Sequence, residues 1–368
     1  MGSAAPEGAP VLICAFASSH YPLAQVLERL EAAWPQATVL GASSSGEFNE
    51  AAEAPQSISA WALWGDFRVH SAMQAGLKDA PESVVEGLAA QLGQHYESHP
   101  HRVGVLLLDA LSGRGEEATL LAATVFDGPT PARLVGGAAG DDLAMEATWV
   151  GVNGQVARDA MALVFLHSRS PFGIGVEHGH AASSAPIEVT RASGNVVYEL
   201  DGRPAWDVWQ ERIAAMTGAS DFDTLDGNAL ARFFFTYSAS LASGTEIKVR
   251  APLQRLEGGA LSFACGIPEG SVIRVTDSTV QRQLDSARAA AVKARDQLGG
   301  RPCAGALVFD CVCRKLILGD GFTDAVRAIS DTLDAPLAGF ETYGEIALDV
   351  TDHSGFHNST TVVLAIPR

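Results

Sequence analysis

The chain has few basic residues and no long hydrophobic run. Of its 368 residues, 25 are Lys or Arg and 43 are Asp or Glu, which gives a formal net charge of −18. A negative protein repels nucleic-acid phosphates and anionic lipid headgroups, whose binding depends on clustered Lys and Arg. No apolar stretch reaches the roughly 18 residues that a membrane-crossing helix needs. We therefore expect neither nucleic acid nor a membrane as a partner.

Signals for export, disulfides and catalysis are also scarce. Residues 1–10 lack the basic and apolar regions of a secretory signal peptide, and we expect them to form a flexible N-terminus. The five cysteines are odd in number, which does not indicate a disulfide framework. No G-x-x-x-x-G-K-[ST], G-x-S-x-G or H-E-x-x-H motif occurs. These absences favour a cytoplasmic protein that is not an enzyme.

What the sequence does contain is an internal repeat. The apolar run VGVLLLD at residues 103–109 returns as GALVFD at residues 305–310, and each run is typical of a buried parallel strand. Helix-like segments and closing strands follow both runs at nearly the same offset. The matched segments are 67–73 with 271–276, 83–92 with 278–298, 116–126 with 323–333, and 160–166 with 360–366. We expect residues 67–166 to superpose on residues 271–366.

A partial third copy opens the chain. It has a strand at residues 11–16, a helical segment at 22–34 and a closing strand at 57–64. Residues 173 to about 240 differ from the repeat and predict a β-rich connector followed by a helix. Short strands that alternate with amphipathic helices indicate an α/β fold, here with internally duplicated βαβ-type halves.

Glycine-flanked loops follow the second strand of each copy. They read GASSSGE at residues 41–47, VGGAAGD at 135–141 and GFETYGE at 339–345. Ligands of open α/β sheets usually bind where strands open into such loops, and hydroxyls and backbone N–H groups suit a polar ligand. A tight turn whose serines bond locally is the simpler alternative. Since equivalent loops of a repeat often meet, we expect Glu47 and Glu345 to line one shared cleft.

Cys311 and Cys313 flank one residue, and Arg314 beside them could lower a thiol pKa. This pattern keeps Cys311 as a candidate pocket thiol, while Cys313 is better explained by packing. A hydrolase or transferase with Cys311 as nucleophile and His357 as base is the alternative function from another class.

Histidines form three clusters. His178 and His180 lie two apart, so they would share one face of a strand, and His357 precedes Asn358 near a second histidine, His353. Imidazoles so placed could hold a metal or haem, although solvent-facing histidines are more common. A third cluster, at residues 95–101, contains a proline and predicts a surface loop.

Several motifs, in order along the chain, together resemble the FIST sensory family. They include the loops at 41–47 and 339–346, Val135-Gly-Gly137, residues 189–204, Phe309-Asp-Cys311 with Arg314, and Phe356-His-Asn358. The resemblance implies a FIST N-terminal domain at 11–216, a FIST C-terminal domain at 217–368, and a role in signal transduction. It also implies a small ligand, for which amino acids or haem with nitric oxide sensing are alternatives, and a partner such as a histidine kinase.

The sequence therefore predicts a cytoplasmic sensor that binds a small molecule. The candidate haem ligands are His178, His180 and His357. The candidate ligand-binding residues are Ser43, Ser44, Ser45, Glu47, Gly136, Gly137, Asp141, Cys311, Arg314, Thr342, Tyr343, Glu345, His357 and Asn358.

Overall fold

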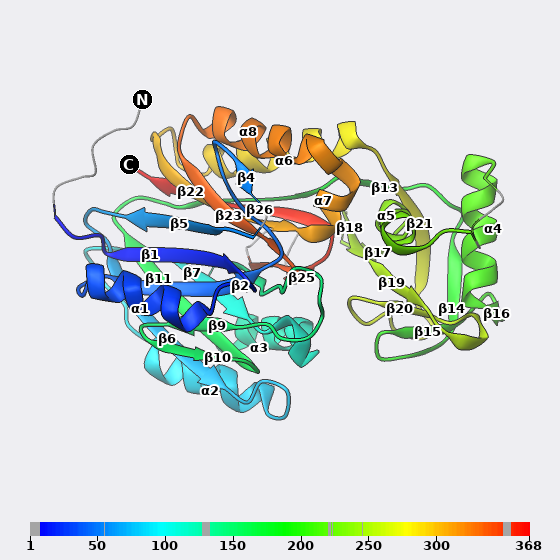
Figure 1. Cartoon of the computed structure of the whole chain (residues 1–368), viewed down its shortest axis with the longest axis horizontal. Coiled ribbons are helices and arrows are strands. Elements are labelled where there is room, and N and C mark those ends of the chain that lie inside the picture. Colours follow the sequence, from blue (N-terminus) through cyan, green and yellow to red (C-terminus); the bar gives the residue numbers. More distant parts are fainter. Residues whose placement is uncertain are drawn as a thin grey trace.

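A computed structural model shows an α/β protein with a second, smaller domain at one end of its long axis (Figure 1). The structure describes residues 8–54, 56–126, 133–219, 222, 224–244, 246–348 and 355–368. Most of the expected flexible segment 1–10 lies outside these residues. Within the described part, no helix is both long enough and apolar enough to cross a membrane.

The first α/β unit shows the pattern that the whole molecule repeats. Strand β1 (Leu12–Ser18) pairs in parallel with β2 (Thr38–Ser44) and antiparallel with β5 (Ile58–Leu63). The crossover between the parallel strands is helix α1 (Leu23–Ala33), because two parallel strands cannot be joined by a tight turn. Alternate residues of β1 therefore face α1 on one side and the centre of the molecule on the other.

The second and third units repeat this order with one more strand each, and with one and two more helices, respectively. The second has sheet order β8-β7-β11-β6 and the third β23-β22-β26-β12. The second comprises β6 (Arg68–Ala75), α2 (Pro81–Gln91), β7 (His101–Leu108), α3 (Gly115–Val125), β8 (Arg133–Ala138) and β11 (Ala160–Ser168). The third comprises β12 (Gly173–His178), α6 (Val280–Asp296), β22 (Cys303–Cys311), α7 (Val312–Leu318), α8 (Phe322–Leu333), β23 (Leu337–Thr342) and β26 (Thr360–Pro367). The predicted internal repeat is confirmed.

Each unit also sends a β-hairpin arm to a neighbouring unit. The arms are β3 (Glu47–Asn49) with β4 (Glu53–Ala54), β9 (Val150–Val152) with β10 (Gln155–Ala157), and β24 (Glu345–Leu348) with β25 (Gly355–His357). The first unit's arm extends the third unit's sheet at β23, the second's extends the first at β2, and the third's extends the second at β8. This cyclic exchange gives the three units an approximate threefold relation.

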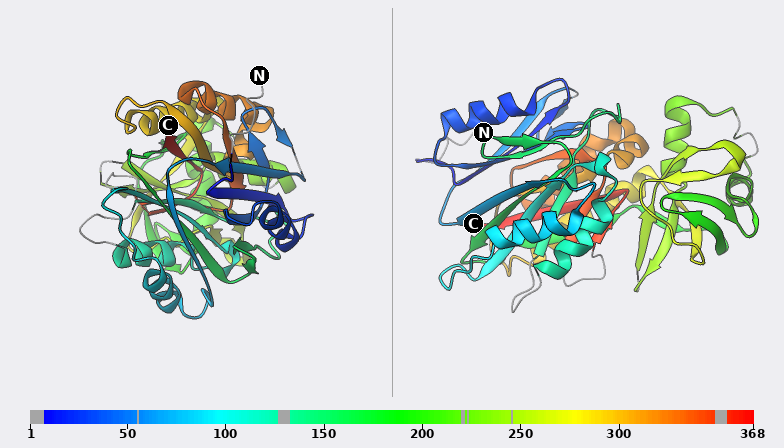
Figure 2. Two further views of the ribbon diagram at one scale, coloured as in Figure 1. Left: turned by 90° about the vertical axis from the view of Figure 1, so that its left-hand side faces the viewer. Right: turned by 90° about the horizontal axis from the view of Figure 1, so that it is seen from below.

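The three sheets pack around one apolar centre, and the helices lie outside (Figure 2). Phe16 of the first unit and Phe340 of the third stack there, with ring centroids 4.4 Å apart. Phe309 meets both rings edge-on. Aromatic pairs of this geometry contribute about 0.5–1.5 kcal/mol each beyond the area they bury. The central core thus couples the first and third units directly.

One predicted match is wrong. The strand expected at residues 271–276 as the partner of 67–73 is β21 (Val272–Ser278), which belongs to a separate nine-stranded sheet. Its place in the third unit is taken by β12, which pairs with β26 as β6 pairs with β11. The sequence suggested the wrong strand because an inserted domain separates β12 from α6 and ends with a strand of its own.

The expected β-rich connector at 173 to about 240 is an inserted domain that runs from residue 180 to residue 278, because residues 173–178 form β12 of the third unit. It has its own hydrophobic core, in which Trp206 and Trp209 are buried. Its elements are β13 (His180–Ala182), β14 (Ile187–Ser193), β15 (Val196–Leu200), β16 (Arg203–Pro204), α4 (Ala205–Thr217), α5 (Gly227–Thr236), β17 (Ala239–Ser243), β18 (Glu246–Arg250), β19 (Pro252–Arg255), β20 (Leu261–Phe263) and β21.

Candidate functional site

The three predicted loops meet at the centre of the threefold arrangement. Ser45 N donates to Glu341 O at 3.1 Å, Gly140 N to Ser43 O at 2.9 Å, and Tyr343 N to Ala138 O at 3.1 Å. In each bond a loop of one unit joins the second strand of the next. The structure therefore brings together the candidate residues 43–45, 136–141 and 342–345 through their backbones.

Glu47 and Glu345 each hold two segments of their own unit together by hydrogen bonds, an arrangement that we call a clip. Glu47 Oε2 accepts from Ser57 N at 2.9 Å, and Glu345 Oε2 accepts from Thr360 N at 3.1 Å. Their Oε1 atoms accept from the hydroxyls of Ser44 and Thr342. Burial raises the pKa of both carboxyl groups, and for Glu345 the nearby Cys311 raises it further. Both side chains are thus occupied in joining an arm to its closing strand.

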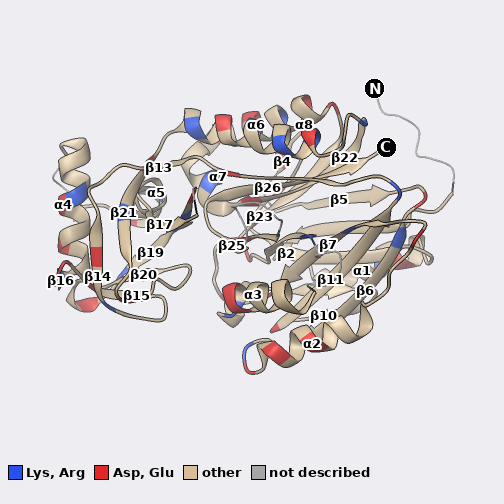
Figure 3. Cartoon of the chain, turned by 180° about the vertical axis from the view of Figure 1, so that it is seen from behind, with Lys and Arg blue, Asp and Glu red and all other residues tan. Residues whose placement is uncertain are grey.

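A large cavity lies between the second unit, the inserted domain and the third unit's arm. Its volume is about 730 Å³, and its walls include Glu116 and Glu117 of α3, Asn195 and Cys265 of the inserted domain, and Tyr343. In Figure 3 the acidic residues of α3 lie at the end of the helix that faces the inserted domain. Cavities of this size at domain junctions are the usual place for small ligands. We call it the junction cavity.

Groups of both charges, together with neutral polar groups, surround the junction cavity. Glu116 forms an ion pair with the buried Arg250. Burial raises the pKa of Cys265 to about 12, so this thiol stays protonated at neutral pH. The first helical N–H groups of α3 have no carbonyl of the same helix to bond, because the first such bond is donated by Ala118 to Arg114 O. The cavity can therefore offer carboxylates and backbone donors to one ligand.

Asn358, a candidate from sequence, lies beside this wall. It bonds the Cys265 thiol, its Nδ2 donates to His357 O at 3.0 Å, and its buried Oδ1 has no partner among the residues that the structure describes. The sequence singled out the motif at 356–358, whose Phe356 also lines the cavity. The sequence did not mark Glu116, Glu117 or Cys265 as site residues, because they come together only in the folded chain.

A second cavity occupies the equivalent position in the first unit. It has a volume of about 520 Å³ and is lined by Ser43 and Asp141 together with Tyr21, Trp149 and the start of α1. Each cavity lies at the end of a strand, β1 or β7, where the next helix begins. An arm from a neighbouring unit forms part of its wall. In the third unit α7 follows β22 directly, and Lys315 of α7 pairs with Glu53 of the arm.

Tyr343 connects the two cavities. Its ring lines the junction cavity, while its hydroxyl donates to Asp141 Oδ1 at 2.5 Å and accepts from Leu143 N at 2.8 Å. Asp141 also accepts from the backbone N–H groups of residues 145, 146 and 147. Burial alone would raise the pKa of Asp141, but these hydrogen bonds lower it, so the carboxylate stays charged.

The segment that Asp141 holds is strained and exposed. Asp142, Leu143 and Met145 adopt left-handed backbone conformations, with φ of 55°, 65° and 57°. Each such residue costs about 1–2 kcal/mol, and strain of this kind collects at functional sites. Leu143 and Met145 are large apolar side chains that remain about half exposed, at 46% and 51%.

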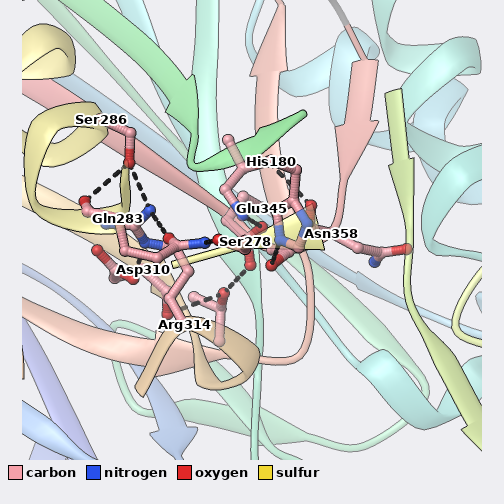
Figure 4. A network of polar contacts seen from close by, with 11 residues as sticks. His180, Ser278, Gln283, Ser286, Asp310, Arg314, Glu345 and Asn358 are labelled. Atoms are coloured by element: carbon pink, nitrogen blue, oxygen red, sulfur yellow. Dashed lines mark hydrogen bonds and ion pairs between the residues drawn. The ribbon is translucent and has the colours of Figure 1, made fainter. Parts of the chain in front are cut away.

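Arg314 is a structural residue at the centre of a buried polar network (Figure 4). Its Nε donates to Asp310 at 2.7 Å, its Nη1 to Ser286 at 2.8 Å, and its remaining donors contact Gln283. The expectation that Arg314 lowers the pKa of Cys311 is wrong. Burial raises that pKa well above its usual value, and the thiol bonds Glu345. A protonated, enclosed thiol of this kind is inert, which removes support for Cys311 as a nucleophile.

Of the candidate haem ligands, His180 and His357 are buried and His178 is half-buried. Both ring nitrogens of His180 contact hydroxyls, Nδ1 with Thr276 at 3.0 Å and Nε2 with Ser359 at 2.7 Å. His357 is also buried, and neither it nor His178 lines either cavity. In the described ranges, no group of three or more His, Cys, Asp or Glu is arranged to hold a metal ion. His353 lies outside those ranges. A haem ligated by one of these imidazoles would therefore lie outside both cavities.

Comparisons with known proteins agree with the resemblance noted in the sequence. The FIST N domain model matches residues 11–203, and the FIST C domain model matches residues 205–348. An uncharacterized protein of Methanocaldococcus jannaschii is 26% identical over 163 residues, which is 42% of this chain and 31% of that protein. This chain thus spans about a third of that relative's length. The two domain models together cover most of the chain, and the protein belongs to the FIST family.

Proposed function

We propose that this protein is a small-molecule sensor whose ligand binds in the junction cavity and whose signal passes to a partner protein. The observation that carries the proposal is Tyr343, which lines the cavity and also bonds the carboxylate that holds the exposed segment 142–147. A ligand that displaced the Tyr343 ring would disturb the hydrogen bond between the Tyr343 hydroxyl and Asp141, which supports that segment. A histidine kinase is the partner class that the family resemblance suggests.

An amino-acid-like metabolite is the ligand class that the cavity supports best. The start of α3 places backbone N–H groups, which bind carboxylates, next to Glu117, which can bind an ammonium group. Glu116 is paired with the buried Arg250, whereas the partner of Glu117 is the exposed Arg114, so a ligand can displace the Glu117 pair more easily. Haem is the alternative ligand, and the imidazole that would ligate it lies outside both cavities in this arrangement.

The test is binding of the twenty amino acids to the purified protein, by thermal shift and then by calorimetry. We expect at least one to raise the Tm, and Glu117→Gln to weaken its binding by about 1.5–3 kcal/mol, the range for hydrogen bonds to charged groups. Glu82→Gln is the matched control, because Glu82 lies in the first turn of α2 and does not line the cavity. Equal losses in both variants, or no binding at all, would contradict the proposal. A Soret band in the visible spectrum would instead identify haem.

A further inference from the structure

A histidine-rich pocket lies outside both cavities, on the second unit. Its volume is about 210 Å³, and its walls include His95 and His99 from the segment before β7, Arg102 of β7 and His167 of β11. The sequence alone suggested only a surface loop for residues 95–101. The fold adds His167 and the neighbouring strand β6, which carries Arg68 and His70.

Strand register places a row of arginine and histidine side chains on one face of this sheet. His167 lies directly opposite Arg102 on β7 and Arg68 on β6. Side chains directly opposite one another in antiparallel strands share a face. His70 lies on the same face, opposite Phe165, and its ring is 6.1 Å from that of His167. Such a row is unusual in a chain with a net charge of −18.

His167 is a buried polar side chain without a hydrogen bond. Only 2% of the residue is exposed, and neither ring nitrogen bonds another residue in the described part of the chain. Its ring instead packs edge-on against Tyr96, with centroids 5.1 Å apart. Because the ring lines the pocket and forms no hydrogen bond within the described residues, its nitrogens are available to a ligand bound there.

The charges around the pocket favour a negative partner. Its lining combines one guanidinium and three imidazoles with a single carboxylate, that of Glu97. The nearby Asp66 is already shared by His99 at 3.1 Å, Arg68 at 3.2 Å and Arg169 at 2.8 Å. A metal ion is disfavoured, because Arg102 would repel it and the described residues form no metal-binding group of His, Cys, Asp or Glu.

We propose that this pocket binds a small oxyanion, whose oxygens accept hydrogen bonds from Arg102 and from the imidazole N–H groups of His167 and its neighbours. A tetrahedral anion such as sulfate or phosphate fits the enclosed volume. The inference is independent of the ligand of the junction cavity.

Binding should depend on pH. Burial and the nearby Arg102, His70, His95 and His99 lower the pKa of His167 to about 4, so its ring is neutral at pH 7. A bound anion would offset those positive neighbours and favour the protonated ring. The bound state therefore takes up a proton, and affinity rises as the pH falls toward the pKa of the free protein.

Sulfate is the probe, because it stays fully ionised over the range tested, and sodium chloride at equal ionic strength is the reference. We expect sulfate to shift the histidine ring resonances of His167 in NMR spectra. We also expect it to bind up to about tenfold more tightly for each unit that the pH falls between about 7.5 and 5.5. His167→Phe keeps a ring of similar size and should reduce this pH dependence, since only the other imidazoles of the pocket can then take up a proton. His101→Phe, an exposed neighbour of Arg102 that does not line the pocket, should leave it unchanged.

Two results would overturn the proposal. One is sulfate behaving like chloride in the wild-type protein at both ends of the pH range. The other is a folded His167→Phe variant, checked by circular dichroism, that binds sulfate with the same pH dependence as wild type. If His167→Phe does not fold, Arg102→Met replaces it, and unchanged sulfate binding in that variant has the same meaning.

Discussion

At the scale of single residues, the acidic side chains that most resemble a binding motif are used for structure. Glu47 and Glu345 both clip an arm to its closing strand, and the residue before the clipped N–H group is left-handed in both units, Gln56 and Ser359. In the second unit Asp159 has the same left-handed backbone, and its N–H bonds Asp109. The clip from an arm is therefore shared by the first and third units, whereas in the second unit the acid follows β7 and binds the N–H of the left-handed residue itself.

The buried ion pair between Arg314 and Asp310 gives the clearest prediction for one residue. Arg314→Met leaves the Asp310 carboxylate without its cation in an enclosed site, which costs about 3–5 kcal/mol. The double variant Arg314→Met with Asp310→Asn should recover a large part of this loss. Urea unfolding measures both.

Arg327→Met is the matched control for this prediction. It breaks the exposed pair with Asp324, which is worth at most about 1 kcal/mol. If Arg314→Met were no more destabilising than Arg327→Met, the network in Figure 4 would not hold α7 in place.

At the scale of elements, the arms determine where cavities form. Each arm extends the sheet of a neighbouring unit, and the two cavities lie beside the arms of the second and third units. The second unit's arm is preceded by the segment 142–149, which adopts the strained turn held by Asp141. This segment is the element best placed to respond to the junction cavity.

Tyr343→Phe tests that coupling. The variant keeps the ring in the junction cavity but removes the hydroxyl that bonds Asp141 and Leu143 N. We expect faster amide hydrogen exchange in residues 142–147, because the strained turn loses a support, and a global stability loss of only about 0.5–1.5 kcal/mol. Exchange followed by mass spectrometry measures this, with Tyr21→Phe as control. Unchanged exchange in this segment would show that Tyr343 does not support the turn.

At the scale of the whole molecule, the three units enclose ionisable groups whose pKa values move in opposite directions. Burial and, to a smaller extent, the nearby Glu53 raise the pKa of Glu341 from 4.5 to about 9. Burial lowers the pKa of His167 from 6.5 to about 4. Both groups are therefore neutral in the folded state at neutral pH, and both link folding to pH.

These shifts predict greatest stability at mildly acidic pH. The folded state keeps the Glu341 proton that the unfolded state loses above its pKa of 4.5, so stability falls as pH rises from 4.5 to about 9. The unfolded state protonates His167 below 6.5 while the folded state does not, so stability also falls as pH drops from 6.5 to about 4. Each group contributes a slope of up to about 1.4 kcal/mol per pH unit.

Glu341→Gln should remove the alkaline part of this dependence. We expect the variant to unfold at higher urea concentration than wild type near about pH 8 and to show a shallower slope from there to about pH 6.5. Glu86→Gln, at an exposed position of α2, serves as control. A slope in Glu341→Gln equal to that of wild type would show that Glu341 is ionised in the folded protein.

The sequence by itself determined the α/β class, the repeat and the family, because apolar periodicity and short glycine motifs are local properties of the chain. It also marked the loops that meet at the threefold centre and the Tyr343 that joins the two cavities. Only the tertiary structure decided which residues form a site. Residues 116, 195, 265 and 343 reach one cavity because an arm crosses between units and a domain is inserted between β12 and α6. Burial likewise turned Glu47, Cys311 and Arg314 from candidate ligand contacts into supports, since a side chain's chemistry depends on its exposure and partners, which arise only when distant segments pack together.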